Sequence, residues 1–273
     1  MPGDPIRVLS DIHYGDRSSR VVRMEALRPL ADGAAALVLN GDTLDTRPGP
    51  RPEHTDLCRR EVVEFFSGVG APVTFITGNH DPDISGRHWL DLAQGRVWAF
   101  HGDVLFDEVV PWATDAGTIR RRVRSALSDA GGRADALPLR ERMELLRVVT
   151  RAVPQRHQSE PRAGRYLLRL CLDLLWPPWR VPRLIGAWRT IPERARRFVR
   201  LYRPQARFAL IGHTHRPGIW RAPKGVTVVN TGAFTRPFPC WVADVEPDRL
   251  RIRSVRRAHG EFRLDGAVAE FAF

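Results

Sequence analysis

The sequence is poor in cysteine and has no long apolar run. Its three cysteines, Cys58, Cys171 and Cys240, are far apart and form no C-x-x-C pair, which excludes a disulfide framework and a zinc module built on cysteines. No apolar run approaches the roughly 20 residues of a membrane-spanning helix. Because the cysteines are widely spaced, we expect them to be reduced thiols in a reducing, cytoplasmic compartment. Met1–Pro5 lead directly into an apolar run, so we expect no secretory signal peptide.

Lysine is almost absent as well. Lysine and arginine together number 43 against 31 acidic residues, a net charge of +12, and Lys224 is the only lysine. The arginines are unevenly distributed. Residues 119–207 contain 22 arginines and 7 acidic residues, a net of +15, whereas the rest of the chain has a net of −3. The positive charge therefore belongs to one segment.

Five polar motifs are present, and each directly follows a short apolar run. Such runs, ended by Gly, Asn or Asp, are typical of buried strands in an α/β fold. The runs are Ile6–Leu9, Ala36–Leu39, Val73–Ile76, Val97–Phe100 and Phe208–Ile211. The motifs are Asp11-Ile12-His13, Gly41-Asp42 with Asp45, Gly78-Asn79-His80-Asp81, His101-Gly102-Asp103 and Gly212-His213-Thr214-His215.

Taken singly, each motif is an ordinary turn at the end of a strand. Taken together and in order, they predict that five strand ends bring oxygen and imidazole ligands to one edge of a sheet. That ligand set suits a pair of Mn, Fe or Zn ions, as in phosphoester-cleaving centres. The proline- and arginine-rich stretch 46–54 is predicted to be a surface loop near the mouth of this site.

The motif series resembles the calcineurin-like metallophosphoesterase superfamily, whose pattern is D-x-H, G-D-x-x-D, G-N-H-D/E, H and G-H-x-H. The resemblance runs from about Ile6 to Phe234, with one long interruption. It implies an α/β fold, a four-layer sandwich of two mixed β-sheets flanked by helices. We expect residues 1–273 to form a single metallophosphoesterase domain, with residues 119–207 as a basic helical insertion or cap within it.

The resemblance also implies how two divalent ions would be held, with manganese expected and iron or zinc as alternatives. One ion would be held by Asp11, His13, Asp42 and His215. The other would be held by Asp42, Asn79, His101 and His213. Asp42 would bridge the two, because a carboxylate has two oxygens. Hydroxide bridging the ions would then attack phosphorus.

Four further residues of the motifs receive supporting roles. His80 would face the substrate and either stabilise the transition state or protonate the leaving oxygen. Asp81 would orient the His80 imidazole through a hydrogen bond. Asp45 and Asp103 would support the ligands from behind. For Asp45, Asp81 and Asp103, capping of a helix or a turn explains the residue equally well.

The basic segment 119–207 is predicted to be helical. The expected helices are 119–127, 137–153, 165–176 and 191–202. The third is apolar on nearly all sides apart from a stripe of Arg165, Arg169 and Asp173. Such a helix is either buried in a protein core or in contact with an apolar partner such as lipid.

Three interpretations of the segment stay open. It is a helical subdomain with its own core, a cap that binds a lipid-bearing anionic substrate at a membrane surface through residues 163–202, or a groove for nucleic acid. Interleaved leucines favour the lipid interpretation. The candidate substrate-binding residues are Arg165, Leu168, Arg169, Leu172 and Trp176.

A narrower resemblance points the same way. The bacterial UDP-2,3-diacylglucosamine hydrolases of lipid A biosynthesis carry a helical insertion between HGD and GHTHRP motifs, as this chain does between His101 and Pro217. This implies a UDP-diacylglucosamine-like substrate and peripheral association with the inner face of the cytoplasmic membrane. The best-known branch has Arg where this chain has His80, and its insertion is shorter and less basic. A related pyrophosphatase, or an enzyme for another lipid-linked phosphodiester, fits as well.

Two other function classes are carried forward. A nuclease or nucleotide phosphodiesterase would use the basic segment to bind nucleic acid. A non-catalytic scaffold would keep the fold and is disfavoured by the complete ligand set. At the C-terminus, 241–245 and 250–255 are predicted to form a hairpin, and the charged stretch from Arg256 to be a loosely held tail.

Overall fold

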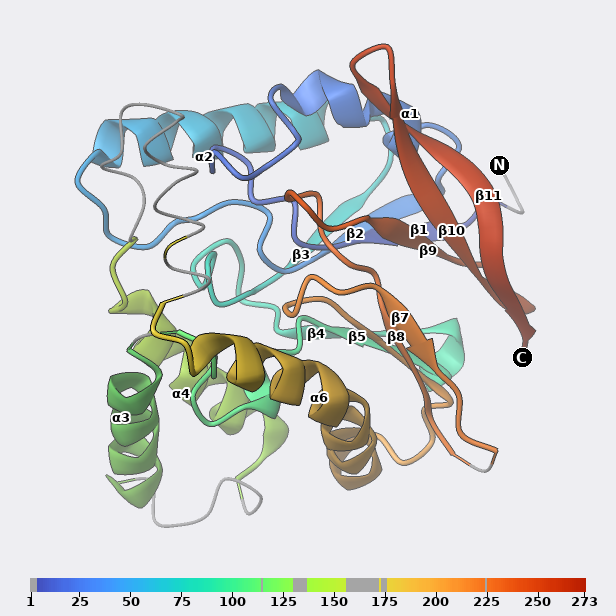
Figure 1. Cartoon of the computed structure of the whole chain (residues 1–273). Helices are drawn as coiled ribbons and strands as arrows, with labels where there is room; N and C mark the ends of the chain where they lie inside the picture. The colour runs from blue at the N-terminus through green and yellow to red at the C-terminus, as the bar shows by residue number, and fades with distance from the viewer. Residues whose placement is uncertain (1–3, 114, 130–136, 156–171, 173–175, 224) are drawn as a thin grey trace.

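Two mixed β-sheets lie face to face with helices on both outer sides (Figure 1). The computed structural model describes residues 4–113, 115–129, 137–155, 172, 176–223 and 225–273. The α/β four-layer sandwich expected from the sequence is confirmed by this arrangement. All five apolar runs that precede the motifs are strands.

The first sheet has the order β11-β10-β9-β1-β2-β3 and the second the order β4-β5-β6-β8-β7. In the first, β1, β2 and β3 are parallel and β9 runs antiparallel to β1. In the second, β5, β6 and β8 are parallel, and the edge strands β4 and β7 are antiparallel to them. The strands are β1 (Ile6–Leu9), β2 (Ala36–Asn40), β3 (Val73–Ile76), β4 (Trp89–Leu92), β5 (Val97–Phe100), β6 (Phe208–Ile211), β7 (Gly218–Trp220), β8 (Thr227–Asn230), β9 (Trp241–Val245), β10 (Arg249–Ala258) and β11 (Glu261–Ala272).

Alternate residues of the central strands belong to different cores, because successive side chains of a strand point to opposite faces. Val8 and Val38 face the interior between the sheets, together with Val97 and Leu210. Their strand neighbours face outwards. Leu9, Leu37 and Leu39 pack under the helices of the first sheet. Trp98, Phe100 and Ile211 pack under the helices of the second. Both faces of each sheet are therefore apolar, and polar side chains are left for the strand ends.

Each sheet has its own helical layer. The first is covered by α1 (Arg28–Ala31) and α2 (Pro52–Ser67), and the second by α3 (Ala116–Asp129), α4 (Leu139–Arg151) and α6 (Arg180–Tyr202). Three short 3-10 turns lie along the chain: η1 (Met24–Leu27) directly before α1, η2 (Ala93–Gly95) between β4 and β5, and η3 (Asp103–Leu105) after β5. Among the described residues no helix has the length and apolar content to cross a membrane.

The helices of the basic segment share a core with the second sheet. Buried Ile191 and Phe198 of α6 and Leu146 of α4 lie in one cluster with Trp98 and Ile211 of the sheet. The segment therefore supplies the outer layer of the sandwich, and its described part has no separate core. That residues 119–207 form a distinct cap over the site stays a prediction.

The start of the last of these helices differs from the sequence prediction. The sequence favours a start near Ile191, because Pro192 suits the first turn of a helix. The structure continues α6 back to Arg180, with Pro192 inside it. Tertiary packing explains the difference, since Ala187 and Ile191 are both buried against the sheet. Of the predicted helix 165–176, only Leu172 and Trp176 lie within the described residues.

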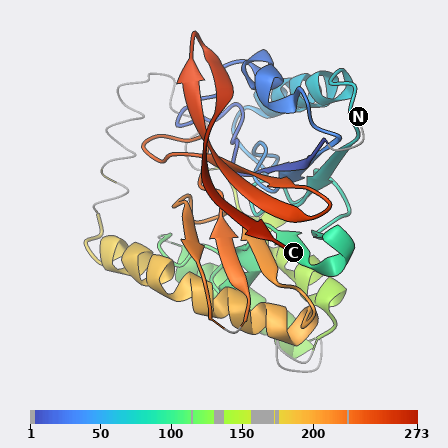
Figure 2. The same cartoon turned by 90° about the vertical axis from the view of Figure 1, so that its right-hand side faces the viewer.

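The prediction of a loose tail after Arg256 is wrong. β10 continues to Ala258, and β11 pairs with it antiparallel to form the edge of the first sheet, the long hairpin in Figure 2. Alternation explains the pairing: Leu250, Ile252 and Phe262 are fully buried. The exposed faces carry cross-strand ion pairs, such as Arg249 with Glu270 at 2.8 Å. High charge in this stretch marks a solvated face of a hairpin.

Replacing Phe198 by alanine tests whether α6 is part of the main core. Its ring stacks on Trp98 with centroids 5.3 Å apart. We expect Phe198→Ala to lower the free energy of unfolding by about 3–5 kcal/mol, as for other large-to-small core substitutions. In urea unfolding followed by circular dichroism, the whole protein would unfold earlier in one transition. Leu201→Ala on the exposed side of α6 is the matched control, with a change of about 0.5 kcal/mol or less. A separate early transition of the helices alone would contradict a shared core.

Candidate metal centre

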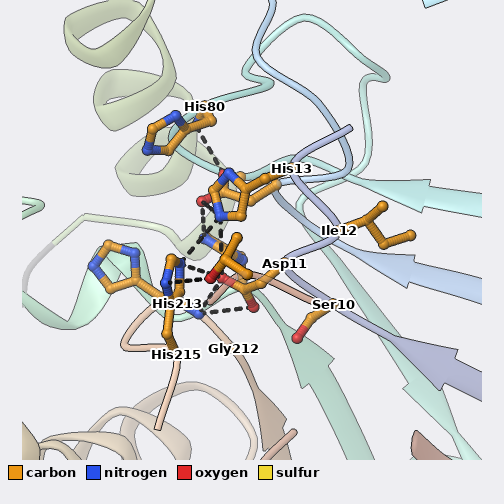
Figure 3. Close-up of polar contacts among 12 residues, drawn as sticks. Ser10, Asp11, Ile12, His13, His80, Gly212, His213 and His215 are labelled. Atoms are coloured by element: carbon orange, nitrogen blue, oxygen red, sulfur yellow. Dashed lines mark hydrogen bonds and ion pairs between the residues drawn. The ribbon is translucent and has the colours of Figure 1, made fainter. Parts of the chain in front are cut away.

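The first and last motifs bring their side chains together across the two sheets. Asp11 and His13 follow β1, and His213 and His215 follow β6. Figure 3 shows these four side chains gathered at one point, while Ile12 turns away towards the core, where it is 1% exposed. Alternation along each loop thus separates ligands from core residues.

The backbone is strained at most of the candidate ligands. Five of the seven candidate ligands have φ in the left-handed region, at 53° for Asp11, 50° for His13, 53° for Asp42, 67° for His213 and 59° for His215. Such conformations are costly for residues with a Cβ and cluster at functional sites. The surrounding sheets hold these turns in place, which points to a functional reason for them.

Two glycines leave room for the carboxylates. A Cβ at Gly212 would collide with the carboxylate of Asp11, and one at Gly78 would collide with the carboxylate of Asp42. The glycine of each motif is therefore needed for close approach of one loop to the next.

The candidate ligands form two adjoining clusters, and His80 lies with His13 and Asp42 in a third grouping that overlaps them. In one, Nε2 of His215 lies 3.3 Å from Oδ1 of Asp11 and 3.1 Å from Nε2 of His13. In the other, ligand atoms of Asp42, His101 and His213 lie within 4.8 Å of one another.

Asp42 borders both clusters. Its Oδ2 lies 3.2 Å from Nε2 of His101 and 3.7 Å from Nε2 of His13. It is 1% exposed, so its charge has little help from water. This is the position that a bridging carboxylate requires. The structure thus brings together six of the seven predicted ligands in the two groupings expected.

Backbone carbonyls fix the tautomers of two histidines. Nδ1 of His101 donates to the carbonyl of Asn40 at 3.0 Å, and Nε2 of His213 donates to the carbonyl of Val109 at 2.8 Å. A carbonyl can only accept, so these two nitrogens carry hydrogens, and the other nitrogen of each ring is the one available to a metal ion. Burial acts to lower the pKa of His101, but the carboxylate of Asp42, 3.2 Å from its Nε2, outweighs burial and raises that pKa well above its usual value. A divalent cation would replace the proton at Nε2 of His101, as metal ligation requires.

The protonation states also suit cations. Burial lowers the pKa of His13 to about 4 and that of His213 to about 3, so both rings are neutral at neutral pH. Burial acts to raise the pKa of Asp42, but the neighbouring imidazoles of His101 and His80 outweigh it and hold that pKa well below its usual value. Neutral imidazoles and ionised carboxylates are the forms that bind metals.

An unsatisfied buried acceptor completes this test of fit. Oδ1 of Asn79 is buried and has no hydrogen-bond partner within the described part of the chain. Asn79, the seventh predicted ligand, is 2% exposed on the loop after β3. A buried acceptor without a donor is costly. Divalent cations would satisfy such acceptors, so the residues present fit the predicted ions.

His80 stands at the edge of the centre, and its carboxylate partner differs from the one predicted. Nδ1 of His80 lies 2.9 Å from Oδ2 of Asp45. The carboxylate of Asp81 instead accepts backbone N–H bonds from Asp42 at 2.9 Å, Thr43 at 2.7 Å and Gly78 at 2.8 Å. The hypothesis that Asp81 orients the imidazole is therefore wrong.

Asp81 has a structural task and Asp45 takes the orienting one. Asp81 is fully buried, and burial, with the nearby charge of Asp42, raises its pKa to about 7. Asp81 ties the second and third motif loops together below Asp42. Asp103 begins η3 behind His101, and burial raises its pKa. Asp45 therefore orients the imidazole of His80, the role predicted for Asp81, and Asp81 supports the loops of the centre, the role predicted for Asp45.

Arg47 is the residue near the centre that sequence reasoning missed. Its guanidinium contacts Asp45 through two nitrogens, at 3.0 and 2.7 Å, and its Nη2 lies 2.8 Å from Nδ1 of His80. The sequence did predict that the arginine-rich stretch 46–54 lies near the mouth of the site. The spacing of residues in the sequence does not show which arginine of that stretch points towards the centre.

A cavity of about 450 Å³ opens beside the centre. His13, His80 and His215 form its inner end. Its walls combine arginines from separate segments with apolar side chains. They include Arg17, Arg47, Arg51, Arg180, Tyr14, Trp112, Ile119 and Val153. Three carboxylates, Asp16, Asp45 and Asp115, line the cavity as well, so it offers apolar surface and charged groups of both signs to a ligand.

The family model for calcineurin-like phosphoesterases matches residues 5–217 of this chain. The chain therefore belongs to the calcineurin-like phosphoesterase family, whose members bind divalent metals and are generally metal-dependent hydrolases. The search of curated proteins found no match. The narrower resemblance to the diacylglucosamine hydrolases is not tested by these comparisons and stays a prediction.

Several solved structures are similar to this chain over nearly its full length. Vacuolar protein sorting 29 from Cryptosporidium parvum is 13% identical, with a TM-score of 0.48 and coverage of 100% of both chains. A dimetal phosphatase from Danio rerio is 12% identical, with a TM-score of 0.45 and coverage of 96% of this chain and 99% of that one. A predicted phosphoesterase from Streptococcus pneumoniae is 13% identical, with a TM-score of 0.39 and coverage of 100% and 99%. No activity is inferred from likenesses of this size.

Replacing Asp42 by alanine tests the bridging position. Because Asp42 borders both clusters, we expect Asp42→Ala to lose nearly all bound metal, whereas His101→Ala keeps roughly half. Metal per chain would be measured by mass spectrometry after reconstitution with Mn and desalting. His259→Asn is the control, since His259 lies in an exposed turn with φ of 52° that asparagine tolerates. Equal metal loss in His101→Ala and Asp42→Ala would show that Asp42 does not bridge.

Proposed function

We propose that the protein is a metal-dependent phosphoesterase that hydrolyses a phosphodiester or pyrophosphate bond of an amphiphilic substrate, with a UDP-diacylglucosamine-like molecule as the leading candidate. The observation that carries the proposal is the convergence of buried imidazoles and carboxylates around Asp42, together with the buried and unsatisfied amide oxygen of Asn79. Asp11, His13, Asp42 and His215 would hold one ion, and Asp42, Asn79, His101 and His213 the other. When bound, the two ions supply Lewis acidity and activate water.

His80 is placed to assist the leaving group. Burial and Arg47 act to lower its pKa, but the carboxylates of Asp42 and Asp45 outweigh them and raise it. Since Asp45 and Arg47 occupy Nδ1, Nε2 is the nitrogen left for the substrate. A protonated His80 would then pass a proton from Nε2 to the departing oxygen.

The cavity supports an amphiphilic substrate. Its four arginines stand beside three carboxylates, and a second phosphate of the substrate would compete with those carboxylates for the guanidinium groups. Its apolar wall, with Trp112, Ile119 and Val153, suits a less polar portion. Of the candidate lipid-binding residues, Arg165, Leu168 and Arg169 lie outside the described residues. Leu172 and Trp176 are 56% and 69% exposed, and neither lines the cavity. The proposal that these residues bind acyl chains is therefore supported by the sequence resemblance.

Contact with an anionic membrane surface is part of the same proposal. Four large apolar side chains are exposed within or just before the N-terminal part of α6. They are Leu172, Trp176, Trp179 and Ile185. The guanidinium of Arg183 lies over the ring of Trp179, 4.1 Å from its centroid. Tryptophan beside arginine suits a membrane interface with anionic lipids. Peripheral association with the cytoplasmic membrane therefore stays our expectation.

The substrate proposal is tested with metal-stripped protein. We expect added Mn to restore release of UMP from UDP-2,3-diacylglucosamine in detergent micelles by at least about 100-fold over the stripped protein, because two-metal centres carry the chemistry. A nucleotide phosphodiester and single-stranded RNA serve as competing substrates. Hydrolysis of these in preference to the lipid would favour the nucleotide alternative. Absence of metal-dependent hydrolysis of any phosphoester would overturn the proposed function.

The role of His80 is tested by changing the leaving group. A poor leaving group such as an alkoxide needs a proton, whereas p-nitrophenolate departs without one. We therefore expect His80→Ala to lower kcat by about 100-fold or more on an alkyl or sugar phosphodiester, and far less on bis(p-nitrophenyl) phosphate, with metal content unchanged. Equal losses on both substrates would show that His80 stabilises the transition state and does not act as the acid.

A further inference from the structure

Gln155, just after α4, makes three hydrogen bonds to the loop that follows the second motif. Its side-chain amide Nε2 donates to the carbonyl of Asp45 at 3.0 Å and to the carbonyl of Arg47 at 2.7 Å. Its backbone N–H donates to the carbonyl of Pro48 at 2.8 Å. A single residue of the basic segment therefore holds the loop backbone from Asp45 to Pro48.

The same loop carries both partners of the His80 imidazole. Nδ1 of His80, Oδ2 of Asp45 and Nη2 of Arg47 form a triangle with sides of 2.9, 2.8 and 2.7 Å. The side chains of Asp45 and Arg47 are 19% and 11% exposed. Movement of the loop backbone would displace both partners of Nδ1 together.

The triangle holds the ring in either tautomer. When Nδ1 carries a hydrogen, it donates to Asp45, and when Nδ1 has a lone pair, it accepts from Arg47. In both states Nδ1 is occupied and Nε2 is left for the substrate. The orientation of the ring therefore depends on the positions of Asp45 and Arg47, and these depend on the loop backbone.

We propose that Gln155 is a positioning residue for His80, which acts by holding the Asp45–Pro48 backbone so that Asp45 and Arg47 fix the imidazole. This gives the basic segment a role in catalysis besides covering the second sheet. The amide is suited to this task because its NH2 group has two donors and the two carbonyls are its nearer acceptors, with Oγ1 of Thr55 farther away at 3.3 Å. The inference rests on the proposed role of His80 in the reaction.

Gln155→Met tests the proposal, because methionine has a similar length and no donor. Misplacement of a catalytic group lowers turnover more than binding. We expect kcat on an alkyl or sugar phosphodiester to fall about 10–100-fold with little change in KM and in Mn content. On bis(p-nitrophenyl) phosphate the loss would be about twofold or less, following the pattern of His80→Ala. Gln205→Met, at an exposed position before β6, is the matched control and keeps wild-type rates on both substrates.

A double substitution separates positioning from general support. If Gln155 acts through His80, adding Gln155→Met to His80→Ala causes no further loss of kcat, because coupled residues are not additive. Additive losses, equal losses on both substrates, or wild-type kcat in Gln155→Met on the alkyl substrate would each overturn the inference. A wild-type protein with no metal-dependent hydrolysis of either substrate would instead overturn the proposed function.

Discussion

The buried carboxylate of Asp42, lying between two groups of imidazoles, is the interaction on which the centre depends. An ionised carboxylate without water needs nearby positive charge or hydrogen-bond donors. The loop provides one donor, the backbone N–H of His80 at 2.8 Å from Oδ1. Towards Oδ2 lie ring nitrogens of His101 and His13. Against the effect of burial, the carboxylate holds the pKa of His101 well above its usual value, so the proton of that ring offsets part of the negative charge. Divalent cations would supply the positive charge in place of that proton, and this explains why the geometry supports a metal centre.

The two sheets hold these acceptors against their mutual repulsion. Strands that are apolar on both faces pack into three layers of core, and their loops have little freedom to relax. The five candidate ligands with left-handed backbone show the cost that the sheets sustain. Asp81 contributes by binding three backbone N–H groups from two of the loops. The core packing and the ligand geometry are thus parts of one arrangement.

The basic segment has more than one relation to this centre. Through α6 it closes the outer core of the second sheet, where Phe198 stacks on Trp98. Through Gln155 it contacts the loop that holds the partners of His80. Through Ile119, Val153 and Arg180 it lines the cavity. A segment that the sequence marks as a charged insertion is therefore connected to the core, to the cavity beside the centre and to the loop that holds Asp45 and Arg47.

Sequence alone determined the five strands that precede the motifs and the identity of the loops that carry the candidate ligands. Short apolar runs ending in Asp, Asn or Gly specify buried strands and turns locally, and motif order then predicts their meeting at one edge. The exchange of roles between Asp45 and Asp81, the inward turn of Arg47 and the hydrogen bonds of Gln155 needed the tertiary structure. So did the true start of α6 and the pairing of β11. Each depends on contacts between residues distant in the chain, and local spacing carries no information about which of several nearby polar side chains will be within hydrogen-bonding distance.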